Sequence, residues 1–327
     1  MITSQDIQIF IATHNRPRLV QDALVSVKNQ SVRGFEVFIL DNSNDGATAD
    51  KKTIFEAAGA KYIQTPQNVL LANFNAAQRL ACAKYVMIFH DDDLLHPQYI
   101  ETALAWLNKY PEITLLSGGC TNFRAEAPSF ANPLSRKAFI YHSGADFAAH
   151  VFSKNMFNYP CCLYKTELFK TAPNLFNIYH KNNDLPFVLS IAEKGTAVII
   201  NDVNCVHTRQ HEQQDSKDSQ NGTELKNLYA WVELFYGQLS TAGKQGKLYQ
   251  AWCVDAYNNI KNAYGYLKKS EKDKMPFAQL LADLKQKGFV DEDIINIGRY
   301  RESVFLRLSS APRRFLWRWR APKAEDL

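Results

Sequence analysis

The chain has 327 residues, 46% of them hydrophobic and 22% charged, which is the composition of an ordinary globular protein with one or two domains. No apolar run approaches the roughly 18 residues of a membrane-spanning helix, and the N-terminal residues have none of the parts of a secretion signal. The net charge of +5 is too small to indicate nucleic-acid binding, and the six cysteines form no C-x-x-C pair. We therefore expect a cytoplasmic protein without a zinc or disulfide framework, with its cysteines in the core.

Short apolar segments alternate with helical patterns through the first hundred residues. Strands are predicted at IQIFIA, EVFIL, KYIQT and YVMIF, which begin at Ile7, Glu36, Lys61 and Tyr85. Helices are predicted over residues 17–30, in a segment that ends near Gly59, and over residues 68–84. Because strands and helices alternate, we expect an α/β fold with a doubly wound, mostly parallel sheet, in which ligands bind beyond the carboxyl ends of the strands.

The second half of the sequence continues this pattern less regularly. Shorter strands are predicted at AVII and VNCVH, and the paired Gly118 and Gly119 end another strand where a close backbone approach is expected. Residues 223–308 have mostly helical patterns. We therefore expect an α/β domain over residues 1–215 and a helical region over residues 216–327 that ends in a basic, aromatic tail.

Polar side chains follow each of the first four predicted strands. They are THNR after the first strand, DNSNDG after the second, Gln67 and Asn68 after the third, and Asp91, Asp92 and Asp93 after the fourth. Each of the first three clusters alone is typical of a turn, but a buried strand that ends in three carboxylates is unfavourable unless water or a cation compensates the charge. The chain has neither G-x-x-x-x-G-K-[ST] nor G-x-G-x-x-G. The pattern therefore favours a nucleotide site in which a divalent metal and aspartates hold the diphosphate.

Three segments resemble successive motifs of the family 2 glycosyltransferases, which have the GT-A fold. They are IFIATHNRPRLVQDALVSVKNQ, FILDNSNDG and AAQRLACAKYVMIFHDDDLLHPQYI, and the resemblance extends over about residues 7–211. It implies an inverting enzyme that transfers a hexose or N-acetylhexosamine from a nucleoside-diphosphate sugar to a hydroxyl of a glycan or lipid-linked acceptor. It also implies assistance by Mn²⁺ or Mg²⁺, which neutralises charge on the leaving diphosphate.

The resemblance also assigns roles to residues of this chain. For binding the nucleotide sugar it implies Thr13, Asn15, Arg16, Asp41, Asn68 and Asp91. The family's usual run is D-x-D-D followed by three residues and Pro, and counting back from Pro97 places His90 at the first acid, which is therefore missing. The metal then falls on Asp92, with Asp93 as a second metal-site or acceptor-side carboxylate and His211 as a ligand after the last strand.

The segment NNDLPFVLSIAEKG resembles the family's E-D-x-x-L-x-x-R-x-x-x-x-G motif. Asp184 falls at the position of the general base, which takes the proton from the attacking hydroxyl, and Asn183 replaces the family's Glu. The residues alone allow a second interpretation, in which Asp184 caps a helix that begins near Pro186. The two roles are compatible with each other.

Two alternatives from other functional classes remain open. One is a sugar-nucleotide pyrophosphorylase, although the glycine-rich, arginine-containing segment of that class is absent and THNRP stands after the first strand. The other is a non-catalytic homologue that binds nucleotide or carbohydrate, since His90 and Asn183 replace the usual acids. Metal-dependent release of nucleoside diphosphate from sugar nucleotides would separate the three.

Residues 299–320 carry seven arginines and one acid, interleaved with Trp and Phe side chains. Such alternation suits the surface of an anionic membrane, while the other interpretation is a terminal helix packed on the α/β domain. Nothing else in the sequence indicates a nucleic-acid partner. Our hypothesis is a peripheral enzyme at the cytoplasmic face of the inner membrane that extends a lipid-linked glycan, such as a lipopolysaccharide, lipooligosaccharide or capsule precursor.

Overall fold

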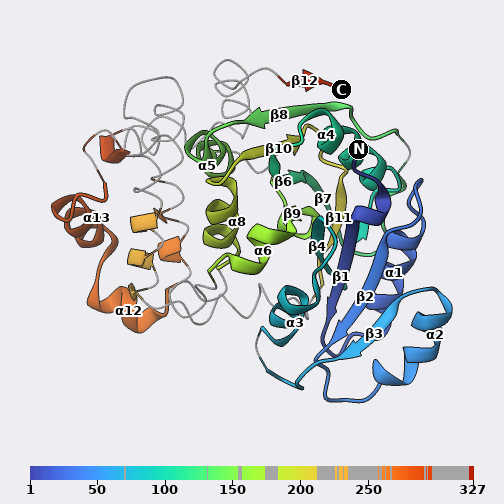
Figure 1. The fold of residues 1–327 in the computed structure, drawn as a ribbon. Helices are drawn as coiled ribbons and strands as arrows, with labels where there is room; N and C mark the ends of the chain where they lie inside the picture. The colour runs from blue at the N-terminus through green and yellow to red at the C-terminus, as the bar shows by residue number, and fades with distance from the viewer. Residues whose placement is uncertain are drawn as a thin grey trace.

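The computed structural model describes residues 1–69, 71–130, 132–153, 157–173, 183–211 and 324–327, with short stretches between residues 225 and 296 (Figure 1). The basic tail at residues 299–320 and much of the predicted helical region lie outside the described residues, so the expectations for them stay predictions. Within the described part, no helix is long and apolar enough to span a membrane.

A nine-stranded sheet forms the centre of the described structure, in the order β12-β8-β10-β6-β9-β4-β1-β2-β3. Its first four strands along the chain are those predicted from the sequence: β1 (Ile7–Thr13), β2 (Glu36–Asp41), β3 (Lys61–Gln64) and β4 (Tyr85–His90). β1 pairs in parallel with β2 and β4, and β2 pairs in parallel with β3. The carboxyl ends of these strands therefore meet at one edge of the sheet, and the polar turns that follow them lie together.

Three helices connect these strands, namely α1 (Leu19–Lys28), α2 (Lys52–Ala57) and α3 (Ala72–Leu80). The prediction of a helix from residue 68 is wrong at its start. Asn68 and Leu71 have positive φ angles of 54° and 63°, and this left-handed conformation cannot continue a right-handed helix. α3 therefore begins at Ala72, and Asn68 lies in the turn after β3.

The sheet is completed by β6 (Ile113–Gly118), β8 (Lys137–Tyr141), β9 (Leu163–Lys165), β10 (Thr196–Ile200) and β12 (Glu325–Asp326). β9 lies antiparallel between β4 and β6, and β8 is antiparallel to β10, whereas β6 and β10 are parallel. The sheet is thus mixed but mostly parallel, which confirms the predicted α/β class.

A second, three-stranded sheet consists of β5 (Leu94–Leu95), β11 (Val206–Arg209) and β7 (Cys120–Phe123), with β11 in the centre. β11 begins three residues later than VNCVH predicted and ends two residues later. Because β5 follows the triple aspartate directly and pairs with β11, this sheet holds the residues after β11 beside the end of β4.

Gly118 and Gly119 are required where β6 gives way to β7. A Cβ atom at Gly118 would lie 2.2 Å from Sγ of Cys205, and one at Gly119 would lie 2.7 Å from the carbonyl oxygen of Asp202. No side chain fits at either position. The close backbone approach that the glycines predicted is therefore made to the segment before β11.

Both faces of the large sheet are buried. In β1, Ile9 and Ile11 pack in one cluster with residues of α1 and α4 (Tyr99–Lys109), while Phe10 packs in the other with Phe187 of α8 (Asp184–Ala192). Burial on both faces explains why the predicted strands are nearly continuous apolar runs. The described cysteines follow the core prediction in part, since Cys161, Cys162 and Cys205 are buried but Cys82 is exposed.

The remaining described elements are short. The helices are α5 (Gly144–Ser153), α6 (Thr166–Thr171), α12 (Lys269–Lys274) and α13 (Phe277–Gln286), with 3-10 turns at Ser4–Asp6, Ala49–Lys51 and Tyr159–Cys161. Buried leucines of α13 belong to the same cluster as Phe10 and Phe187. This packing does not test where the α/β domain ends, so the domain boundary predicted near residue 215 stays a prediction.

The last residues of the chain return to the α/β domain. β12 pairs antiparallel with β8, the backbone N–H of Leu327 donates to the carbonyl oxygen of Arg136 at 3.1 Å, and the hydroxyl of Tyr110 donates to Glu325. β12 therefore covers the edge of β8, which would otherwise present unpaired backbone groups.

Candidate functional site

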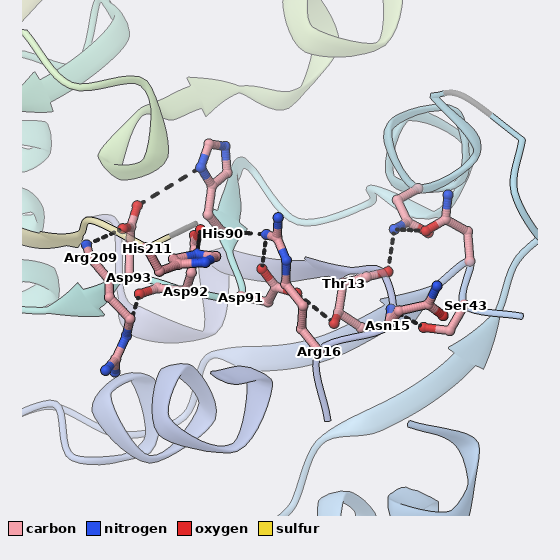
Figure 2. A network of polar contacts seen from close by, with 12 residues as sticks. Thr13, Asn15, Arg16, Ser43, His90, Asp91, Asp92, Asp93, Arg209 and His211 are labelled. Atoms are coloured by element: carbon pink, nitrogen blue, oxygen red, sulfur yellow. Dashed lines mark hydrogen bonds and ion pairs between the residues drawn. The ribbon is translucent and has the colours of Figure 1, made fainter. Parts of the chain in front are cut away.

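The three aspartates predicted to hold a metal lie at the end of β4, close to the ends of β1 and β11 (Figure 2). Their exposed fractions are 2% for Asp91, 8% for Asp92 and 1% for Asp93. Three neighbouring carboxylates are unfavourable when buried unless opposite charge or hydrogen bonds compensate them. The contacts of each one show how far this compensation goes.

Asp91 is compensated by the turn after β1. Its Oδ2 accepts a hydrogen bond from the hydroxyl of Thr13 at 2.7 Å, and its Oδ1 lies 3.0 Å from Nη1 of Arg16. Burial nevertheless raises the pKa of Asp91 to about 6, with the charge of Asp92 adding to the rise and Arg16 opposing it. The structure thus brings together three residues predicted to bind the nucleotide sugar.

Asp92 contacts a guanidinium and an imidazole. Its Oδ2 lies 3.4 Å from Nη1 of Arg16 and 3.0 Å from Nε2 of His211. His211 follows β11, so the three-stranded sheet positions its side chain beside the carboxylates. Asp92 and His211, two predicted metal ligands that are far apart in the sequence, are therefore in direct contact.

Asp93 is compensated only on one side. Its Oδ1 accepts the backbone N–H of Arg209 at 3.2 Å, whereas its Oδ2 has no hydrogen-bond partner among the described residues. Nδ1 of His90 is 3.8 Å from that oxygen. Burial and the charge of Asp92 hold the pKa of Asp93 well above its usual range.

A metal ion would fit beside these carboxylates. His90, Asp92 and Asp93 each offer one ligand atom, and the three atoms lie within 4.8 Å of one another. One imidazole nitrogen and two carboxylate oxygens are donors that Mn²⁺ accepts, and Mg²⁺ accepts the oxygens. The buried Oδ2 of Asp93 has no hydrogen-bond partner in the part of the chain that the structure describes, and this favours a cation here over a purely structural cluster.

Arg209 and His207 are two further basic residues of β11. Arg209 is held by Oδ2 of Asp22 in α1 at 3.0 Å and by the carbonyl oxygen of Asp92 at 3.3 Å, and it lies over the ring of Phe123. His207 is buried, and its ring stacks on Phe130 with centroids 3.9 Å apart. Arg209 therefore borders the carboxylates, whereas the stacking of His207 indicates a packing role.

The turns after β1 and β2 hold each other. Asn15 has a positive φ of 53°, its backbone N–H donates to the hydroxyl of Ser43 at 2.6 Å, and its side-chain amide exchanges two hydrogen bonds with Asn44. Asp41 accepts the backbone N–H of Ser43 at 2.9 Å through Oδ1 and the hydroxyl of Tyr62 at 2.6 Å through Oδ2. Both of these predicted residues thus fix the turns, and direct contact with a nucleotide stays a prediction for them.

Asn68 and Asn73 connect the third strand end to the other two. The backbone N–H of Asn68 donates to the carbonyl oxygen of Asn42 at 3.0 Å. Asn73, which the sequence analysis missed, donates to the carbonyl oxygen of Thr13 at 3.0 Å and accepts from the hydroxyl of Thr65 at 2.7 Å. The sequence did offer a signal for Asn73. It is an amide in the first turn of a helix, and that turn faces three polar strand ends.

Asp184 is the first residue of α8, and Asn183 occupies the N-cap position, so the interpretation of Asp184 as the cap is wrong. Its side chain is exposed, yet the surrounding protein desolvates the carboxyl enough to raise its pKa to about 7. Because this side chain is exposed, a substrate can reach the carboxyl. Desolvation and then the charge of Asp184 raise the pKa of Tyr159, whose ring centroid is 6.1 Å from that of His90.

Comparisons with known proteins bear on the family and the fold. Residues 8–148 match the family model described as Glycosyl transferase family 2. Among solved structures, S. aureus TarS 1–349 in complex with UDP-GlcNAc is similar with a TM-score of 0.55 and 14% identity, over 93% of this chain and 93% of that chain. The mannosyltransferase PcManGT from Pyrobaculum calidifontis in complex with GDP-Man and Mn²⁺ is similar with a TM-score of 0.50 and 14% identity, over 92% and 88% of the two chains. No curated protein matches the chain in sequence.

Proposed function

We propose that this chain, whose residues 8–148 match glycosyltransferase family 2, is an inverting enzyme that transfers a sugar from a nucleoside-diphosphate sugar to an acceptor hydroxyl. The observation that carries the proposal is the cluster of three buried aspartates at the carboxyl ends of parallel strands, bordered by Arg16, Arg209 and His211. Ligands of open α/β sheets bind at this edge. Residues 216–327 are proposed as a mostly helical region of the enzyme, except for the last residues, which pair with β8 of the α/β domain.

The donor is proposed to lie along the turns after β1, β2 and β3. Thr13 and Arg16 hold Asp91 in place for the ribose or diphosphate, and Asn15, Asp41 and Asn68 shape the surface for the nucleotide. Structures of similar fold contain UDP-GlcNAc or GDP-Man. We therefore propose a hexosyl- or N-acetylhexosaminyltransferase that uses a donor of this kind.

Asp92 is proposed as the principal ligand of Mn²⁺ or Mg²⁺, together with Asp93 and His211. A bound ion would supply Lewis-acid stabilisation of the leaving diphosphate. Arg16 and Arg209 lie beside the same carboxylates and add positive charge at this end of the sheet. The chain's own cations therefore favour the negative diphosphate in this position.

Asp184 is proposed as the general base on the acceptor side. A base works best when its pKa is close to the working pH, because it must be ionised and still attract a proton. The pKa of Asp184, raised to about 7 by desolvation, meets this condition, and its exposed side chain can be reached by a hydroxyl.

The experiment that tests this function is release of nucleoside diphosphate from a panel of UDP- and GDP-sugars. We expect metal-dependent release, and we expect Asp92→Asn to reduce turnover by about a hundredfold or more, since one charge-stabilising group is worth that much. Asp50→Asn, at an exposed carboxylate outside the site, is the matched control and should retain turnover. Formation of nucleoside triphosphate from pyrophosphate would instead indicate a pyrophosphorylase, and tight donor binding without turnover would indicate a non-catalytic homologue.

We also propose that the acceptor is a lipid-linked glycan, such as a lipopolysaccharide precursor, at an anionic membrane surface on the cytoplasmic side. The arginine and aromatic residues at 299–320 support this class, since each basic residue near such a surface contributes about 1 kcal/mol.

Flotation with anionic vesicles at low and high salt tests this proposal. Truncation before the tail would also remove β12 and uncover the edge of β8, so substitution is the better change. We expect a variant with Gln at Arg314, Arg318 and Arg320 to lose salt-sensitive flotation. A control with Gln at the exposed Lys52, Lys194 and Lys269 should keep it. Equal flotation of the two variants would show that these arginines do not bind the membrane surface.

A further inference from the structure

His90 stands where the family resemblance expects an acid, and the structure places its ring at the group of atoms able to hold a cation. We propose that His90 is a direct ligand of the ion, together with Asp92 and Asp93, and that its nitrogen makes the site select Mn²⁺ over Mg²⁺. This inference rests on the proposed function, because it concerns the ion of the same site. It changes the ligand set that the sequence predicted, which contained no residue before Asp92.

The first support is distance. Nδ1 of His90 is 3.8 Å from Oδ2 of Asp93, and the ligand atoms of His90, Asp92 and Asp93 all lie within 4.8 Å of one another. Ligands placed at about 2.1 Å around an octahedral ion are roughly 3 Å apart when adjacent and roughly 4 Å apart when opposite. Small side-chain rotations therefore bring all three atoms onto one ion.

The second support is the unpartnered oxygen. Oδ2 of Asp93 is buried in a residue that is 1% exposed, and no hydrogen-bond donor among the described residues reaches it. Oδ1 of the same carboxylate is fixed by the backbone N–H of Arg209. Figure 2 shows Oδ2 on the side of the carboxylate that faces the His90 ring. A buried acceptor without a donor is rare in proteins, and a cation between this oxygen and His90 would satisfy it.

The existing contacts of Asp91 and Asp92 determine which of these two carboxylates can bind an ion. Both oxygens of Asp91 are engaged, by Thr13 and by Arg16. Oδ2 of Asp92 lies 3.0 Å from Nε2 of His211, which is the separation of two adjacent ligands of one ion. His211 can therefore complete the set from the other side, while Asp91 stays outside it.

The identity of the ligand atom sets the preferred metal. Mg²⁺ takes oxygen ligands almost exclusively, whereas an imidazole nitrogen suits the first-row transition metals. The side chain of His90 is 43% exposed, so an ion can reach it from solvent. Replacing the family's carboxylate by imidazole at this position therefore shifts the site toward Mn²⁺.

Binding of Mn²⁺ and Mg²⁺ to the full chain tests the inference without any turnover. In wild type, calorimetry should give tighter binding of Mn²⁺ than of Mg²⁺, and His90→Asp, which restores the family's acid, should reduce the ratio of the two affinities by about tenfold or more. His90→Ala should weaken Mn²⁺ binding by a similar factor. His142→Ala, at an exposed imidazole that contacts Thr196, is the matched control and should leave both affinities unchanged.

Spin-echo modulation of bound Mn²⁺ reports coordinated nitrogen directly. To remove the contribution of His211, the measurement is made in a His211→Gln protein, which should retain the ¹⁴N signal, and in the His90→Ala, His211→Gln double variant, which should lose it. Circular dichroism checks that each variant is folded.

The outcomes separate this inference from the proposed function. A ¹⁴N signal that depends on His90, found in a protein that releases no nucleoside diphosphate, would support the ligand and contradict the glycosyltransferase proposal. Metal-dependent turnover with no His90-dependent ¹⁴N signal, or with an unchanged Mn²⁺ to Mg²⁺ ratio in His90→Asp, would overturn the ligand and leave the function standing.

Discussion

Asp41 and Asp93 are two carboxylates in similar positions with different surroundings. Each is 1% exposed. Asp41 is the last residue of β2, and Asp93 lies three residues after the end of β4; both strands pair with β1. Asp41 accepts two donors, the backbone N–H of Ser43 and the hydroxyl of Tyr62, one on each oxygen. Among the described residues, Asp93 accepts one donor, and its Oδ2 has none. Burial alone therefore does not mark a ligand site. The difference lies in whether hydrogen bonds within the protein already satisfy the buried group.

Substitution of the exposed Asp184 should cause the largest loss of turnover, because the proposed base moves its proton only in the transition state. Asp184→Asn should reduce turnover by about 10² to 10⁴ with little change in donor affinity. Turnover and donor binding by calorimetry measure the two effects. An equal loss in both, or full activity, would show that the carboxylate does not move the proton.

Asp92→Asn and Asp41→Asn form a matched pair that tests the comparison directly. Asp92→Asn should cause a loss of turnover of about a hundredfold or more with no loss of folding stability, since it removes a charge next to two other buried carboxylates. Asp41→Asn should cost about 1 to 3 kcal/mol of unfolding free energy and a smaller loss of turnover.

Urea denaturation and donor turnover measure both members of this pair. If Asp41→Asn affected turnover more than Asp92→Asn did, the satisfied carboxylate would be the more direct participant, and the comparison would have to be reversed.

The dependence of activity on pH is the next expected effect. The base must be ionised, and its pKa is raised to about 7, so kcat/KM should fall about tenfold per pH unit below pH 7. Asp91, whose pKa is raised to about 6, should add to the fall at lower pH. Residual activity of Asp184→Asn should lack the inflection near pH 7. A profile that is flat between pH 6 and 8 would contradict the assignment of Asp184.

The strands of this site could be predicted because they are buried on both faces. Such burial leaves continuous apolar runs, as in IQIFIA and YVMIF, and the polar residues that follow mark the carboxyl ends. β9, by contrast, has only three residues, too few for a periodic pattern. Its antiparallel insertion between β4 and β6 depends on tertiary packing.

The contacts within the site were predictable only in part. The family resemblance predicted the residues that meet around Asp91 and Asp92, including His211, which is distant in sequence. It did not predict that Tyr62 and Asn73 hold the turns, because side chains of one strand and one helix meet there only after the sheet has formed. The positive φ of Leu71 likewise overrides the helical composition of residues 68–71.

Tyr62→Phe gives the smallest expected effect and isolates the satisfied side of the comparison. The change removes the hydroxyl that donates to Oδ2 of Asp41 and keeps the ring that stacks on Phe55. The buried carboxylate of Asp41 would then lack one donor, so we expect a loss of about 1 to 3 kcal/mol in unfolding free energy and a change in turnover of only a few-fold.

Tyr110→Phe is the matched control for this substitution, since the hydroxyl of Tyr110 donates to the exposed Glu325. Water can replace that donor, and the expected loss is below about 1 kcal/mol. Denaturation of both variants in urea gives the difference. If Tyr62→Phe were as stable as Tyr110→Phe, Asp41 would not depend on its second donor, and an open oxygen would no longer distinguish Asp93 from it. If stability fell as expected while turnover stayed close to wild type, Asp41 would be a residue that positions the turn, and the reacting groups would lie on the side of Asp92 and Asp93.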